Sequence, residues 1–160
     1  MSIGEIKYWA SLFRAGAEKA HRQGLFKTQP FNDFPNACCG DAPELLAQFL
    51  TENYDSNSKY KCVYGVFRYD DFENIFGHSW LVVNDCVIVD ITSDQRQFKD
   101  ARIFPQNAWV PCFVGRRSDF HSLFEIEPLQ SKDFHGIDTM GRDTYLRLKT
   151  LYDTITQSIE

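Results

Sequence analysis

The spacing of apolar residues predicts a helix at the start of the chain. Residues 3–22 carry apolar side chains three or four positions apart, as on one face of an amphipathic helix: Ile6, Trp9, Ala10, Phe13, Ala17 and Ala20. Gly24 lies where such a helix should end. The next segment, residues 25–36, contains two prolines and two asparagines among its aromatic residues, which favours a loop.

Two further helices are expected. Asp41 and Glu44 form an acidic variant of the capping-box pattern, and Pro43 suits a first helical turn. A helix should therefore begin near Asp41 and run to about Leu50. From residue 143 onward, helical spacing returns and predicts a C-terminal helix with an apolar face made of Leu148, Leu151, Tyr152, Ile155 and Ile159.

The middle of the chain has the pattern of strands. Residues 61–69 and 108–115 are rich in β-branched and aromatic residues, and each predicts a strand. Residues 78–83 and 86–91 predict a β-hairpin, with a loop at 70–77 before it. Both arms of the hairpin are almost entirely apolar, so they should lie in the middle of the sheet and be covered on both faces. The expected fold is α+β: N-terminal helices on an antiparallel sheet and a C-terminal helix, in a single domain spanning residues 1–160.

Composition and charge narrow the class of protein. The apolar share of 43% suits a packed globular domain. The net charge of −5, without a Lys/Arg run, gives no reason to expect nucleic acid or an anionic membrane as partner. The first twenty residues lack the apolar core of a signal peptide, and no stretch reaches the roughly 18 apolar residues of a membrane span. A cytoplasmic protein is expected, with secretion by a specialised system left open.

The cysteines point to free thiols. There are five, an odd number, which does not fit an even disulfide framework. Cys62, Cys86 and Cys112 lie in apolar strand context, where cysteine usually packs as a small core residue. Cys38 and Cys39 instead precede Gly40 and Asp41 at the start of the second helix. A thiol at a helix N-terminus is favoured as thiolate, the form that acts as a nucleophile.

A cysteine nucleophile needs a base and an acceptor that orients the base. His78 on the first hairpin arm and Asp90 on the second could supply them if both side chains share a face. A register with these two residues directly opposite leaves a three-residue loop at 83–85, whereas a two-residue loop at 84–85 would send them to opposite faces. We therefore predict a three-residue turn with a bulge and a left-handed Asn or Asp.

Residues 34–95 resemble the transglutaminase-like branch of the papain-like cysteine fold. The resemblance rests on "CCGD" at a helix start, "GHSW" on a strand and "VIVDIT" on the next strand. It implies Cys39 as nucleophile, His78 as base and Asp90 as orienter. Gly40 replaces the tryptophan that often follows the nucleophile, and Ala37 replaces a glycine that is often found two residues before the nucleophile. With the short chain and no evident calcium loop, this favours a hydrolase, amidase or deamidase over a protein cross-linking enzyme.

The mechanism that this resemblance implies is an acyl-enzyme on Cys39, formed from an amide, ester or thioester. An amide-bearing protein, peptide or small molecule is the expected substrate, without a cofactor or metal. One oxyanion donor would be the Cys39 backbone N–H. A second donor or substrate contact is open among Asn36, Asn32 and Gln29, and Trp80 is a further candidate for the pocket wall.

The sequence is compatible with several alternatives. Cys38 could be the reactive thiol, and Asp94 could orient the base in place of Asp90. Zinc sites usually take ligands from pairs spaced as C-x₂-C or H-x₃-H, and the sequence contains neither spacing. A module that keeps the fold but has lost its chemistry would serve in binding, and acyl transfer from a thioester to an arylamine is a further enzymatic possibility. His21, His121 and His135 lack a comparable context and receive no role.

Overall fold

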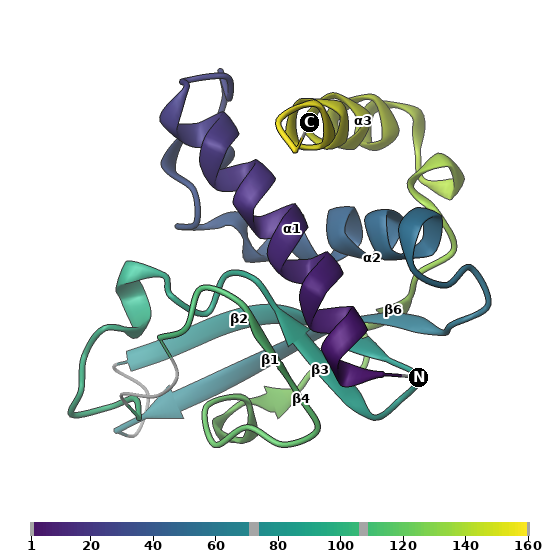
Figure 1. Ribbon diagram of the computed structural model, residues 1–160. Coiled ribbons are helices and arrows are strands. Elements are labelled where there is room, and N and C mark those ends of the chain that lie inside the picture. The colour runs from purple at the N-terminus through teal and green to yellow at the C-terminus, as the bar shows by residue number, and fades with distance from the viewer. Residues whose placement is uncertain (1, 71–73, 106–108, 160) are drawn as a thin grey trace.

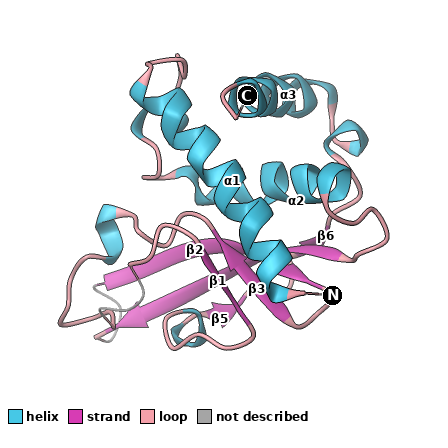
Figure 2. Cartoon of the chain, viewed as in Figure 1, coloured by secondary structure: helices cyan, strands magenta, loops and turns pink. Residues whose placement is uncertain are grey.

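The computed structural model describes residues 2–70, 74–105 and 109–159, and it has an α+β architecture. The α-helices lie on one side of a six-stranded antiparallel sheet, and short 3₁₀ helices lie beside its other parts (Figures 1 and 2). The predicted fold class is therefore confirmed at the level of N-terminal helices, antiparallel sheet and C-terminal helix.

The helices lie close to their predicted positions. They are α1 (Ile3–Arg22), α2 (Ala42–Asn53) and α3 (Arg142–Gln157). Gly24, with φ of 65°, follows the end of α1 and donates its N–H to the His21 carbonyl at 2.9 Å. This is the left-handed position at which glycine commonly stops a helix.

The predicted capping box of α2 is wrong. Asp41 makes no side-chain cap, and its carboxylate pairs with Arg147 of α3. Glu44 forms an ion pair with Lys132 at 2.5 Å instead of reaching back to the helix start. Both carboxylates therefore form ion pairs with cationic side chains from distant segments and do not cap the helix. Pro43 occupies the first turn of α2, as expected.

The strand order is β4-β3-β2-β1-β5, and β6 also pairs with β1. The strands are β1 (Tyr60–Tyr69), β2 (Asn74–Val83), β3 (Val87–Asp90), β4 (Phe113–Gly115), β5 (Glu125–Ile126) and β6 (Lys132–Asp133). The hairpin strands β2 and β3 thus both have neighbours on each side, as predicted. The two-residue strands β5 and β6 are too short to leave a periodic pattern in the sequence.

Two strand boundaries differ from the prediction. Strand β2 already begins at Asn74, so the expected loop at 70–77 is wrong beyond residues 71–73, which lie outside the described residues. Strand β4 is shorter than the predicted 108–115, of which residue 108 also lies outside the described part. The Val110 carbonyl accepts the Ser93 hydroxyl at 2.9 Å, so this segment bonds to a loop before it joins the sheet.

The alternation of side chains along β2 separates two cores. Leu81 and Val83 face the helices and join the larger core. His78 and Trp80 point to the opposite face, where a cluster of aromatic rings covers the sheet. We call these residues the aromatic cluster: Val63, Trp80, Phe98, Phe104, Phe120 and Phe124. The prediction that the hairpin is covered on both faces is confirmed.

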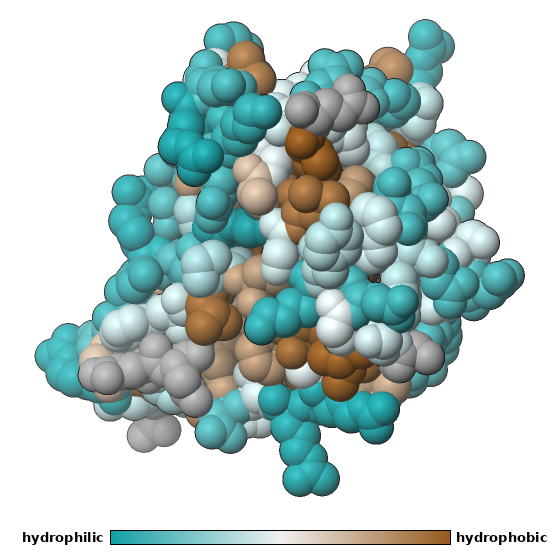
Figure 3. Space-filling model, in the orientation of Figure 1, coloured by the Kyte–Doolittle hydropathy of each residue, from teal (hydrophilic) through white to brown (hydrophobic). Residues whose placement is uncertain are grey.

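The face of the molecule seen in the orientation of Figure 1 is mostly polar. The view in Figure 3 is dominated by hydrophilic residues, with smaller hydrophobic areas along its centre. Among the described residues, no helix combines the length and the apolar character needed to cross a membrane.

The contact between α1 and α3 depends on the absence of a side chain at Gly16. A Cβ there would lie 2.6 Å from Ile159 Cγ1 and 2.8 Å from the Ile155 carbonyl oxygen. Gly16→Ala should therefore lower the free energy of unfolding by about 1–3 kcal/mol, as overpacking does. The control is Gly4→Ala in the same helix, where Ser2 Oγ at 3.6 Å is the nearest atom, and it should be neutral or stabilise by up to about 1 kcal/mol. Urea denaturation measures both, and equal effects would contradict this account.

Candidate active site

The β2–β3 hairpin brings His78 and Asp90 to the same face. Leu81 pairs with Val89 and Val83 with Val87, so the register is shifted by two residues from the predicted one. The loop has three residues, as predicted, but they are Asn84, Asp85 and Cys86 instead of residues 83–85. A shift of two leaves the side-chain faces unchanged, because the side-chain period of a strand is two.

The turn itself explains this register. Asn84 and Asp85 both have left-handed backbone, with φ of 49° and 54°, and Cys86 donates its N–H to the Val83 carbonyl at 3.1 Å. Asn and Asp tolerate this conformation better than other non-glycine residues. Cys86 is consequently an exposed loop residue, and the expectation that it packs in the core is wrong.

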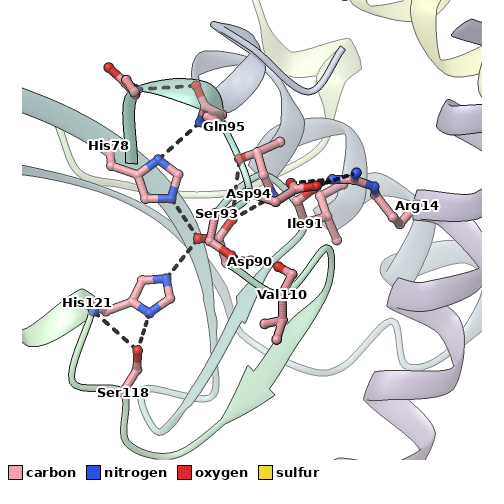
Figure 4. Close-up of polar contacts among 12 residues, drawn as sticks. Arg14, His78, Asp90, Ile91, Ser93, Asp94, Gln95, Val110, Ser118 and His121 are labelled. Carbon is pink, nitrogen blue, oxygen red and sulfur yellow. Dashed lines mark hydrogen bonds and ion pairs between the residues drawn. The ribbon is translucent and has the colours of Figure 1, made fainter. Parts of the chain in front are cut away.

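Asp90 is a buried carboxylate with a full set of donors. Only 2% of the residue is exposed. One carboxylate oxygen lies 2.6 Å from His78 Nε2 and 2.8 Å from His121 Nε2 (Figure 4). The other accepts the Thr92 N–H at 2.8 Å. Burial alone would raise the pKa of Asp90, but the positive charge of His78 and the hydrogen bonds of both imidazoles hold it far below its usual range.

His78 is enclosed between Asp90 and the aromatic cluster. Its ring is fully buried and lies 4.9 Å from the ring of Phe98 and 5.6 Å from that of Phe120, measured between centroids. Burial opposes a charge on the imidazole. The charge of Asp90 and hydrogen bonds to Asp90 and Cys39 outweigh it and raise the pKa of His78 to about 9. An ionised Asp90 can only accept, so His78 Nε2 carries a proton and Nδ1 is the nitrogen available to the thiol.

Cys39 reaches His78 because strand β3 is short. It lies in a 3₁₀ turn (Cys38–Gly40) just before α2, and this turn packs against β2. The last described β2–β3 pair is Leu81 with Val89. Strand β3 therefore does not cover the edge of β2 before Leu81, and the turn can pack there. The backbone of Ser79 hydrogen bonds to the Cys39 thiol there.

The surroundings of Cys39 favour the thiolate. Burial by itself would raise the pKa of this thiol. The hydrogen bond and positive charge of His78 oppose that effect, with help from the Ser79 backbone and the Gln95 side chain, and lower the pKa below its ordinary value. A thiol with a lowered pKa next to an imidazole with a raised pKa favours a thiolate–imidazolium pair.

Cys38 has the opposite surroundings. The residue is fully buried, and its thiol donates to the Asn36 carbonyl at 3.3 Å. Burial, together with the neighbouring Cys39 and acidic groups, raises the pKa of Cys38 to about 12. Between two adjacent cysteines, only Cys39 therefore lies beside a base and remains partly exposed.

The other sequence candidates lie in different places. The Asn36 side chain accepts the Arg96 N–H at 2.9 Å and so joins two loops. Gln29 is exposed, and no hydrogen bond between described residues ties it to the thiol. Trp80 lies in the aromatic cluster, with its ring 5.0 Å from that of His121 and 5.9 Å from that of His78. Asp94 binds Arg14 through two bonds of 2.8 Å, which excludes it as the partner of His78 in this structure.

Two residues near the site were missed at the sequence level. His121 donates to Asp90, and its Nδ1 lies 2.6 Å from the Ser118 hydroxyl. Gln95, on the loop after β3, contacts both Cys39 and His78. His121 lies 31 residues beyond Asp90, on a segment with no periodic pattern, so no local signal links them. Gln95 closely follows Asp90, and its position in "VIVDITSDQ" was the only available signal.

His78, Asp90 and His121 also form a possible ligand set for a metal. Their nearest nitrogen and oxygen atoms lie within 4.8 Å of one another. Zinc bonds of about 2.0–2.1 Å in a tetrahedron would hold ligand atoms roughly 3.3 Å apart. The separations of 2.6 and 2.8 Å are those of hydrogen bonds. These residues therefore fit a closed hydrogen-bonded cluster better than a metal site.

Comparison with known proteins found no matching family model, no matching curated protein and no matching solved structure. What the site can do chemically therefore follows from its own geometry. That geometry is a partly exposed thiol, an imidazole and a carboxylate in a row, which is the arrangement that nucleophilic catalysis by cysteine requires.

The thiols should differ sharply in reactivity. In a Cys86→Ser background, which removes the exposed loop thiol, iodoacetamide at pH 7 should alkylate Cys39 at least about ten times faster than Cys38, because the pKa of Cys39 is lowered and that of Cys38 is raised. Peptide mass spectrometry over time measures each rate. His78→Gln should shift the pH midpoint for Cys39 upward, toward about 8.5 for a free thiol. Faster labelling of Cys38 would reverse the assignment.

Proposed function

We propose that this protein is a cysteine-dependent hydrolase or acyltransferase that acts on an amide through an acyl-enzyme on Cys39. The observation that carries the proposal is the position of His78, which bonds Asp90 through Nε2 at 2.6 Å and the thiol through its other side. Cys39 is the nucleophile, His78 the acid and base, and Asp90 the group that orients the imidazole.

The resemblance to transglutaminase-like enzymes supports this proposal. Nucleophile, base and orienter follow the same order along the chain, with the thiol before a helix and the other two on adjacent strands. Ala37, where a glycine is often found, has a left-handed backbone with φ of 58°. Glycine adopts that conformation easily, so the turn keeps the shape that a glycine there would give it.

The residues divide the reaction between them. The Cys39 thiolate attacks the carbonyl carbon of the amide, and the tetrahedral intermediate collapses to a thioester as the His78 imidazolium protonates the leaving amine. His78, now neutral, removes a proton from water, or from a second amine, which attacks the thioester and regenerates the thiol. Asp90 stabilises the imidazolium throughout, since it stays ionised.

The exposure of the site residues favours substrates whose carbonyl group can reach the Cys39 sulfur from solvent. Cys39 is partly exposed, whereas His78 and Asp90 are buried, so a substrate can reach the sulfur but not the far side of the imidazole. Side-chain amides of proteins, peptides and small amides all meet this requirement. The cysteines are all free thiols, which is in keeping with a reducing, cytoplasmic setting.

An acyl-enzyme should form on Cys39. With p-nitrophenyl acetate, the wild-type protein should gain one acetyl group on Cys39, and Cys39→Ala should gain none there. Cys38→Ser, the matched control, should react like wild type. Asp90→Asn should slow acylation on the order of 10²–10⁴-fold, because an amide cannot stabilise the imidazolium or hold its tautomer. Intact mass and peptide mapping give the result.

A folded protein that alkylates at Cys39 but never acylates would contradict this function and favour the binding-module alternative. Ammonia release from glutamine peptides and amine incorporation then separate hydrolysis from acyl transfer. Circular dichroism on each variant shows whether a loss of acylation reflects a loss of fold.

The pH dependence of amide turnover should be bell-shaped. The rate should rise with pH through the lowered pKa of Cys39 as thiolate forms. It should fall as pH rises through the His78 pKa of about 9, because the imidazolium that protonates the leaving amine is lost. Alkylation by iodoacetamide needs no such acid, so its rate should keep its plateau above pH 9. A turnover rate that does not fall at high pH would rule out His78 as the general acid.

A further inference from the structure

The amide of Gln95 has an orientation that its neighbours determine. The residue is 1% exposed. Its Oε1 accepts the Ala37 N–H at 3.0 Å and the Gln97 side-chain amide at 3.3 Å. The Ala37 backbone N–H can only donate, so it identifies that end as the oxygen, and the NH₂ group occupies the other end. Figure 4 shows this NH₂ end directed at His78.

The NH₂ group of Gln95 lies at the reacting atoms. Its nitrogen is 3.5 Å from His78 Nδ1, and the side chain hydrogen bonds to the Cys39 thiol. In the thiolate–imidazolium pair, Nδ1 carries a proton and cannot accept a hydrogen bond from Gln95. Both amide hydrogens are then available to the sulfur and to an oxygen that arrives beside it.

We propose that Gln95 is a catalytic residue whose Nε2–H, with the Cys39 backbone N–H, stabilises the oxyanion of the tetrahedral intermediate. This inference rests on the proposed acyl-enzyme function. As sulfur adds to the carbonyl carbon, the C=O π pair moves to oxygen, which becomes negative. When the pair returns, the bond to the leaving group breaks, and that group departs with its electrons.

The backbone donor fits the same place. Cys38 donates its N–H to the Pro35 carbonyl, and Asp41 donates its own to the Cys38 carbonyl. The Cys39 N–H makes no backbone hydrogen bond to another described residue, and it adjoins the attacking sulfur. Asn36, by contrast, uses its side-chain oxygen on Arg96 and its NH₂ on Asp33, so it is a poorer second donor.

Two reagents separate this role from a structural one. p-Nitrophenyl acetate acylates Cys39 through a tetrahedral oxyanion, whereas iodoacetamide alkylates it by direct displacement without one. In Gln95→Met, acylation should fall about 100-fold, the usual effect of losing one oxyanion donor. The alkylation rate, taken at a pH where the thiol is fully ionised, should stay within about threefold of wild type. Gln130→Met, the same change at an exposed position between β5 and β6 that makes no contact with Gln95, should leave both rates unchanged.

Gln95→Glu guards against a folding defect, because it keeps the side-chain length and an acceptor for the Ala37 N–H. It should also lose acylation, since a carboxylate cannot donate, and its alkylation midpoint should move to higher pH. Equal loss of both reactions in the two folded variants, or no loss in either, would overturn the role of Gln95. A wild-type protein that alkylates at Cys39 but forms no thioester would instead overturn the proposed function itself.

Discussion

The negative charge of Asp90 is the constraint on which the arrangement around the thiol depends. A carboxylate with 2% exposure is unstable in a folded protein unless donors compensate for lost water. Here two imidazoles and the Thr92 backbone supply them at 2.6–2.8 Å. Removal of one partner from such a buried pair typically costs about 3–5 kcal/mol, so the donors are held in place as firmly as the carboxylate.

This constraint organises segments that are far apart in sequence. His121 ties the loop before β5 to the end of β3, and the aromatic rings that flank it, Phe120 and Phe124, then close over His78. The low polarity of this enclosure would keep an isolated imidazole neutral. Because Asp90 is ionised within the same enclosure, the imidazole is charged instead, and its charge in turn favours the Cys39 thiolate.

The loop after Asp90 connects the site to the helical side of the fold. Arg14, buried in α1, binds both the Ile91 carbonyl and the Asp94 carboxylate, as Figure 4 shows. This holds the loop against α1 and positions Gln95 next to Ala37. The Gln95 side chain links Ala37, just before the turn that carries Cys39, to the imidazole of His78 on β2. It thereby holds the turn and the strand together beside the sulfur.

Local sequence by itself determined the three helices, the hairpin and the shared face of His78 and Asp90, because helical and strand periods are properties of a short stretch of chain. Even the register error of two residues preserved that face. Only the tertiary structure decided that Asp41 and Glu44 pair with Arg147 and Lys132, that His121 joins Asp90, and that Gln95, not Asn36, approaches the thiol. These contacts join segments whose separation in sequence carries no periodic signal. The contact of His121 forms at the buried charge of Asp90, beside the aromatic cluster, whereas the two ion pairs form where partly exposed cations of α3 and β6 meet the start of α2.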